Sequence, residues 1–201
     1  VIGSLDDLAV QASVEMSIGK TGNLKSSTVI KSNTLVDALN TNLKLYSEGR
    51  YFDDNGVTLG SGPLPPEAGK ATTYRVLWSI SNDLHEVRDL TVFAVLPTDV
   101  SWTNKFDIAA GDISYNDASR TVAWKINRLP LSVPVVKASF EVSLTPAADQ
   151  VGKLVILIPR TILTAFDPQS QGKLAMSSQP ITSEIESDTR ADGRGIVVKG
   201  Q

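Results

Sequence analysis

Apolar and polar residues alternate along much of the chain, a pattern that predicts β-strands. The clearest example spans residues 71–82, where apolar side chains recur at a spacing of two between polar ones. This is the pattern of a half-buried strand. Similar alternation surrounds Trp124 and Phe140. We therefore expect two facing sheets to meet around Trp78, with Tyr74, Trp124 and Phe140 beside it in the core.

Other segments repeat this arrangement. The further strands expected from alternation are residues 28–32, 42–47, 90–96, 112–116, 120–127, 138–144, 172–178 and 180–186. Residues 153–166 are apolar on both faces, which is typical of a central strand, here broken or bulged at Pro159. Asn55 and Gly56 predict a hairpin tip, and residues 34–40 read as a linker or a single helical turn. Because no helix of ten or more residues is required, the prediction is an all-β, immunoglobulin-like antiparallel sandwich.

The N-terminal stretch also alternates, and it precedes the region expected to form the sandwich. Its apolar positions are Leu8, Val10, Ala12, Val14 and Met16. We interpret it as a strand outside the main module that could complete the sheet of a neighbouring copy.

An internal repeat suggests how the chain is divided. The segment that starts at Ile30, IKSNTLVD, resembles IESDTRAD, which starts at Ile185, about 150 residues later. Chance similarity between short segments is the alternative. The hypothesis is that residues 1–37 close a preceding repeat, residues 38–192 form one complete module, and residues 193–201 begin a following repeat or form a tail. A period of this length exceeds that of solenoids, so each copy is expected to fold independently.

Composition narrows the setting. The chain has 201 residues, of which 41% are hydrophobic, enough for a core. The net charge of -3 with well-mixed signs argues against nucleic acid and anionic membranes as partners. There is no Cys, which excludes disulfides and thiolate metal sites. No apolar run approaches the roughly 20 residues that span a bilayer. The sequence starts at Val1, without an initiator Met or a signal segment, so we expect it to be a piece of a longer chain.

Several ordered motifs carry a family resemblance. GSGPLPPEAG precedes a strand with Tyr74, Trp78 and Asn82, and LTVFAVLPTDVSW, VAWKI and FEVSLTPAADQVG follow. This series, over roughly residues 43–192, resembles the immunoglobulin-like conserved repeat domains of bacterial cell-surface proteins, whose function is mostly undefined. The resemblance implies a β-sandwich outside the cell, used as a stalk, adhesin arm or surface-layer element. It brings no catalytic residues.

Candidate metal and catalytic groups are few. His85 is the only His, so the sequence offers few residues for a His-based metal site or a Ser-His-Asp triad. We interpret His85 as a solvated loop residue. The run from Asp53 offers oxygen ligands but lacks the remaining spacing of an EF-hand. Glu184, Asp188 and Asp192 lie at the proposed module boundary, where shared Ca²⁺ could stiffen a stalk. A solvated acidic linker is the alternative, and no other cofactor is expected.

Three further possibilities depend on side-chain placement. Asp107 and Asp112 would need a cleft to act as glycosidase carboxylates. If exposed, Trp102 and Trp124 could stack on carbohydrate, although Trp at a strand centre is usually core. A Lys-Asn crosslink would need Lys44, Lys125 or Lys137 to be buried beside an Asn and a carboxylate. These three lysines lie on or beside predicted strands.

The leading hypothesis is a non-enzymatic structural module of an extracellular, cell-surface protein. Its expected partners are neighbouring repeats of the same chain or identical chains. The alternatives are an adhesin domain that binds surface glycans or proteins, and a filament subunit that assembles by strand exchange.

Overall fold

The computed structural model describes residues 9–18 and 28–200, and this part of the chain is almost entirely strand and turn. The strands are β1 (Ala9–Ala12), β2 (Glu15–Ile18), β3 (Thr28–Lys31), β4 (Leu35–Ala38), β5 (Lys44–Arg50), β6 (Thr72–Ser81), β7 (Val87–Val95), β8 (Val100–Ile108), β9 (Asp112–Asn116), β10 (Thr121–Leu129), β11 (Val135–Leu144), β12 (Ile156–Ile158), β13 (Ile162–Asp167), β14 (Gly172–Ser177) and β15 (Ile181–Thr182). A 3-10 turn, Ala148–Gln150, precedes β12. Among the described residues, no helix is long and apolar enough to cross a membrane.

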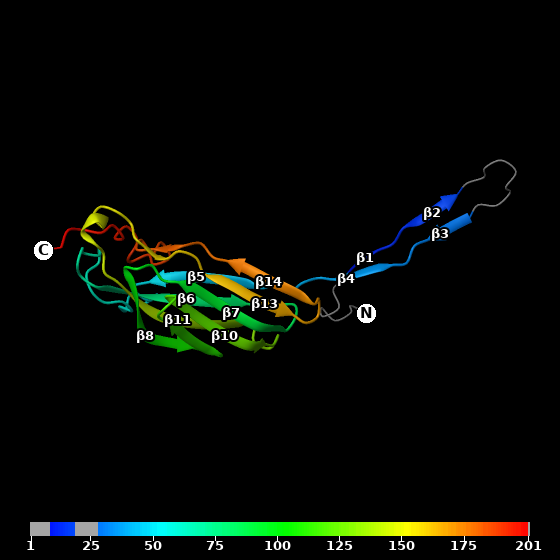
Figure 1. Ribbon diagram of the computed structural model, residues 1–201, viewed down its shortest axis with the longest axis horizontal. Coiled ribbons are helices and arrows are strands. Elements are labelled where there is room, and N and C mark those ends of the chain that lie inside the picture. Colours follow the sequence, from blue (N-terminus) through cyan, green and yellow to red (C-terminus); the bar gives the residue numbers. More distant parts are fainter. Residues whose placement is uncertain (1–8, 19–27, 201) are drawn as a thin grey trace.

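Two antiparallel sheets form the body of the molecule (Figure 1). The four-stranded sheet has the order β5-β6-β11-β8, and the five-stranded sheet has the order β14-β13-β7-β10-β9. This is an immunoglobulin-like plan. β5 and β6 pair, the chain then crosses to the second sheet with β7, and β13 and β14 form a hairpin in that sheet. One departure is that β8 joins the first sheet before β9 and β10 return to the second.

The strand around Trp78 is central to the core. β6 pairs with β5 on one side and β11 on the other, and its residues alternate between buried and half-buried along its whole length. The Trp78 and Phe140 rings meet edge to face with centroids 4.7 Å apart. Tyr74, Trp78, Trp124 and Phe140 are all fully buried. Trp124 comes from β10 in the opposite sheet, so both sheets contribute large side chains to one core.

Three expectations about strands were wrong. Residues 153–166 do not form one interrupted strand: β12 pairs with β15, whereas β13 lies in the five-stranded sheet. Pro159 lies between the two strands, and its missing N–H favours a break in the ladder. Residues 34–40 contain β4 in place of a helical turn, because β4 pairs with β1. The alternating N-terminal stretch is divided into β1 and β2 at Ser13 and Val14.

The C-terminal segment returns to the same sandwich. The Val197 N–H donates to the Lys153 carbonyl and the Gly152 N–H donates to the Val197 carbonyl, at 3.0 and 2.8 Å. Val198 forms a parallel bridge with Glu67, and the Val197 side chain is buried. Residues 195–200, predicted to begin a following repeat or to form a tail, therefore pack against this module.

Candidate assembly site: the hairpin arm and its root

A two-part β-hairpin projects from one end of the sandwich (Figure 1). β1 pairs with β4 and β2 pairs with β3, in both cases antiparallel. We call the described residues 9–18 and 28–38 the hairpin arm. Within the described part of the chain, β1 to β4 form no ladder with any strand of the two large sheets.

The hairpin arm exposes apolar side chains. Val10, Val14, Met16 and Leu35 are 56%, 69%, 52% and 69% exposed, and Ala12 is exposed as well. Leu8, predicted to belong to this set, lies outside the described residues. A two-stranded ribbon with an uncovered apolar surface is only marginally stable in water, and such surfaces typically mark interaction sites. The exposed apolar surface therefore makes the arm a candidate interaction site.

A serine hydroxyl bridges the break between the two halves of the arm. The Ser32 N–H donates to the Val14 carbonyl at 2.8 Å, and the Val14 N–H donates to the Ser32 Oγ at 2.8 Å. The Ser32 hydroxyl donates in turn to the Asn33 carbonyl at 3.0 Å. These bonds connect the two strands at the point where the ladder is interrupted, between β1–β4 and β2–β3.

A buried polar cluster, the arm root, holds the chain where it enters the sandwich. The Thr41 hydroxyl donates to Asn82 Oδ1 at 2.7 Å and accepts the His85 N–H at 2.9 Å. The Thr41 N–H donates to Asp167 Oδ2 at 2.8 Å, and the same oxygen lies 2.9 Å from His85 Nδ1. The amide of Asn82 completes the cluster by donating to the His85 carbonyl at 2.6 Å. All four residues are buried, so the position of Thr41 is fixed from three sides.

The interpretation of His85 as a solvated loop residue was wrong, because it is only 3% exposed. An ionised carboxylate can only accept hydrogen bonds, so the contact with Asp167 requires the proton to be on His85 Nδ1. Sequence reasoning missed this cluster because its members come from three separate segments, and only Asn82 belonged to a recognised motif.

The Asp167 carboxylate is stabilised in its ionised form. Desolvation by burial acts to raise the pKa of Asp167, but it is outweighed by hydrogen bonds from His85 and from the backbone of Thr41, Ser170 and Gln169. The net pKa of this carboxyl is lower than usual. The arm root is therefore held by hydrogen bonds to an ionised carboxylate.

Asp188, proposed as a Ca²⁺ ligand, serves the backbone instead. Its Oδ2 accepts the N–H groups of Tyr51 and Phe52 at 2.8 and 2.7 Å, and its Oδ1 accepts those of Arg190 and Ala191 at 3.1 and 3.2 Å. Burial acts to raise the pKa of Asp188, but these bonds lower it below its usual value. A carboxylate offers about four lone-pair positions, and here all four are used.

The other two acidic candidates are not gathered around Asp188. Glu184 accepts the N–H groups of Gly193 and Gly195, and the Asp192 side chain is exposed. No group of three or more His, Cys, Asp or Glu side chains able to hold a metal ion occurs in residues 9–18 and 28–200.

The run from Asp53 forms the predicted hairpin tip. Asp53 Oδ1 accepts the N–H groups of Asn55 and Val57 at 2.9 and 2.7 Å, so this carboxylate closes its own turn. Gly56 has a φ of 86°, a left-handed conformation that favours glycine.

Trp102 and Trp124 do not form a pair of exposed rings. Trp124 is buried and its indole donates to the Ala110 carbonyl at 2.8 Å. Trp102 is half-buried and stacks near Phe106 and Tyr115, with centroids 6.2 and 5.8 Å away.

The crosslink and glycosidase hypotheses also depended on placement. Lys44, Lys125 and Lys137 are all exposed, so none meets the requirement for a buried lysine. Asp107 and Asp112 are exposed on β8 and β9.

The chain is similar to known proteins at the level of solved structures. No family model matches the chain, and no curated protein matches it. Similar solved structures include BcpA, the major pilin subunit of Bacillus cereus, at 12% identity and a TM-score of 0.48, covering 86% of this chain and 47% of that chain. The full-length major pilin SpaD of Corynebacterium diphtheriae is similar at 11% identity and a TM-score of 0.45, covering 70% of this chain and 34% of that chain.

The C-terminal domain of the AgI/II polypeptide BspA of Streptococcus agalactiae is 12% identical at a TM-score of 0.37, covering 74% of this chain and 53% of that chain. The chain thus spans about half the length of BcpA and of the BspA domain, and about a third of the length of SpaD. At TM-scores under 0.5, these likenesses carry no argument about ancestry or function. The immunoglobulin-like plan rests on the strand order described above.

Proposed function

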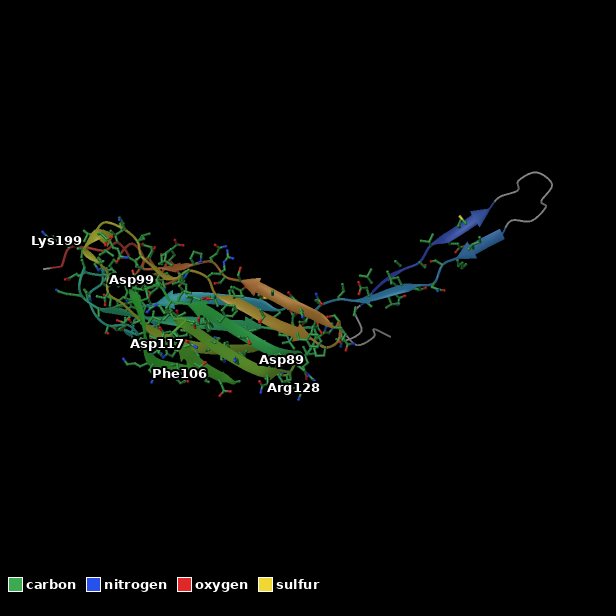
Figure 2. The ribbon with its side chains drawn as sticks, in the orientation of Figure 1. Asp89, Asp99, Phe106, Asp117, Arg128 and Lys199 are labelled. Atoms are coloured by element: carbon green, nitrogen blue, oxygen red, sulfur yellow. The ribbon has the colours of Figure 1, made fainter. Side chains whose placement is uncertain are left out.

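We propose that the chain is a non-enzymatic structural module of a bacterial cell-surface protein, where it acts as a stalk, spacer or surface-assembly element. The observation that supports this best is the placement of its ends. The hairpin arm projects from one pole, and the C-terminal segment with Lys199 lies at the opposite pole (Figures 1 and 2). Domain termini are often close together. A module entered and left at opposite poles instead separates its neighbours in the chain.

The domain division suits this role. Residues 1–37 would belong to the joint with a preceding unit, residues 38–192 to the sandwich, and residues 193–201 to the exit towards the next unit. The arm root would then fix the direction in which the sandwich leaves the joint.

Surface labelling of intact cells tests the proposal. A membrane-impermeant amine reagent applied to the source bacterium should label exposed lysines such as Lys137 before lysis, and an in-frame deletion of residues 38–192 should leave the flanking regions exported and labelled. Labelling of the full-length protein only after lysis would overturn the proposed surface role.

A second candidate is a filament subunit, favoured by the apolar surface of the hairpin arm. In that case the purified chain would form assemblies that grow with concentration, measured by sedimentation velocity. A chain that stays monomeric across a wide concentration range would remove this candidate.

A further inference from the structure

The hairpin arm repeats, bond for bond, the hairpin that ends this sandwich. In the arm, the Ser32 N–H donates to the Val14 carbonyl at 2.8 Å; in the sandwich, the Ser178 N–H donates to the Thr161 carbonyl at 2.9 Å. The Val14 N–H donates to the Ser32 Oγ, and likewise the Thr161 N–H donates to the Ser178 Oγ. Each serine hydroxyl then donates to the carbonyl of the next residue.

The strand pairing on one side of this serine also matches residue by residue. β2 pairs with β3 as β13 pairs with β14: Met16 lies opposite Ile30, and Leu163 lies opposite Met176. On the other side of the break, β1 pairs with β4 as β12 pairs with β15. The two divided hairpins thus share one serine bridge and the register of the ladder from β2 to β3. Beyond the break they share the antiparallel pairing, but β12 and β15 have a register shift between Ile156 and Ile158 that β1 and β4 lack.

Corresponding residues of the two hairpins differ in burial, and the difference shows which face of the arm is uncovered. Leu163, which corresponds to Met16, is fully buried, and Met176, which corresponds to Ile30, packs against the core. In the arm, Met16 and Ile30 are 52% and 48% exposed. The arm therefore presents to solvent the face that its counterpart turns into a sandwich.

The opposite face follows the same rule. Thr164 is exposed in the sandwich, and its counterpart in the arm is Ser17. The neighbouring residue Glu15 pairs with Lys31 in a solvated ion pair at 3.1 Å. Glu15, Ser17 and Lys31 thus lie with Val29 on the face that remains outside, which gives the arm an inner and an outer side.

The free edge of the arm shows where a further strand would join. β13 pairs with β14 on one side and with β7 on the other, so that Leu163 lies opposite Val92. Within the described residues, β2 pairs only with β3. The missing neighbour of β2 is a strand equivalent to β7.

We propose that the hairpin arm is the closing hairpin of a second sandwich of the same kind, which the polypeptide N-terminal to the arm supplies, with Met16 and Ile30 in its core. A second copy of this chain fits less well, because the place beside its β7 is already filled by β13 with Leu163 fully buried. An incoming arm would have to displace that hairpin. The inference rests on the proposed function, since it names the neighbour to which this module is joined.

Single cysteines test which side of the arm is covered. The chain contains no Cys, so Met16→Cys and Ile30→Cys each introduce one thiol on the inner side, and Ser17→Cys and Val29→Cys are matched controls on the outer side. Each variant is made in the 201-residue chain and in the natural polypeptide extended upstream by about 110 residues, the distance from β5 to β12. Thiol-labelling rates are then measured at several protein concentrations.

We expect all four thiols to react within about threefold of one another in the 201-residue chain. In the extended polypeptide, Met16→Cys and Ile30→Cys should react at least about 100-fold more slowly, because labelling then requires local opening, while the two controls stay fast. Equal rates on both sides in the extended polypeptide would overturn the proposal. Inner-side protection already present in the 201-residue chain, rising with concentration and accompanied by a dimer mass in light scattering, would overturn it in favour of a second copy. Either failure leaves the surface-labelling result unaffected.

Discussion

At the scale of single residues, buried carboxylates tie distant loops together. Asp167 holds the arm root, and Asp188 collects the backbone around Tyr51 and Ala191. From the sequence, both could be recognised only as charged residues, and Asp188 was considered either a candidate Ca²⁺ ligand or part of a solvated acidic linker. A buried charge that accepts several backbone hydrogen bonds stabilises the loops that supply the donors, and it becomes costly when one partner is removed.

Asp188→Asn should destabilise the sandwich by about 2–4 kcal/mol, because the amide removes the charge and turns one acceptor into a donor facing backbone N–H groups. Urea unfolding followed by Trp fluorescence measures the change. The control Asp192→Asn alters an exposed side chain and should change stability by no more than about 0.5 kcal/mol. Equal effects of the two substitutions would contradict the role given to Asp188.

At the scale of elements, alternation correctly predicted strands that lie between two other strands of a large sheet. β6, β10 and β11 appear where the pattern placed them, because each buries one face against the opposite sheet. β4 was missed because its strand character depends on pairing with β1, and a local pattern contains no information about a distant partner. For the same reason, the division between β12 and β13 and the arm root, whose residues meet only after folding, were not predicted.

Removal of residues 1–38 should leave the sandwich folded, with a melting temperature within about 3 °C of that of the whole chain. The physical reason is that the described arm residues are all exposed where their burial is known, so few stabilising contacts are lost. Differential scanning calorimetry of the two chains checks this. A fall of 10 °C or more would mean that the arm contributes to the core.

At the scale of the whole molecule, the sandwich depends on ionised carboxylates at two places. The pKa values of Asp167 and Asp188 are both lowered in the folded state. A lowered folded-state pKa means that stability is fully present above the unfolded-state value of about 3.9 and declines as pH falls through the folded-state value.

The urea midpoint should therefore be steady between pH 5 and pH 7 and decrease below about pH 4. Repeating the measurement with Asp188→Asn should give a shallower decrease, since that variant has already lost one of the two titrating groups. A variant whose acid sensitivity equals that of the parent chain would assign the effect to other carboxyls.

The opposite poles of entry and exit also determine how the module would carry a mechanical load. A pull applied through the arm root reaches β5 first, and β5 runs towards the other pole (Figure 1). The hydrogen bonds between β5 and β6 are perpendicular to the strands, so tension along β5 shears the ladder from Lys44 to Arg50 as a unit. Bonds loaded in this way break together and not one after another, so a load that entered at Thr41 would meet the resistance of the whole ladder between β5 and β6 at once.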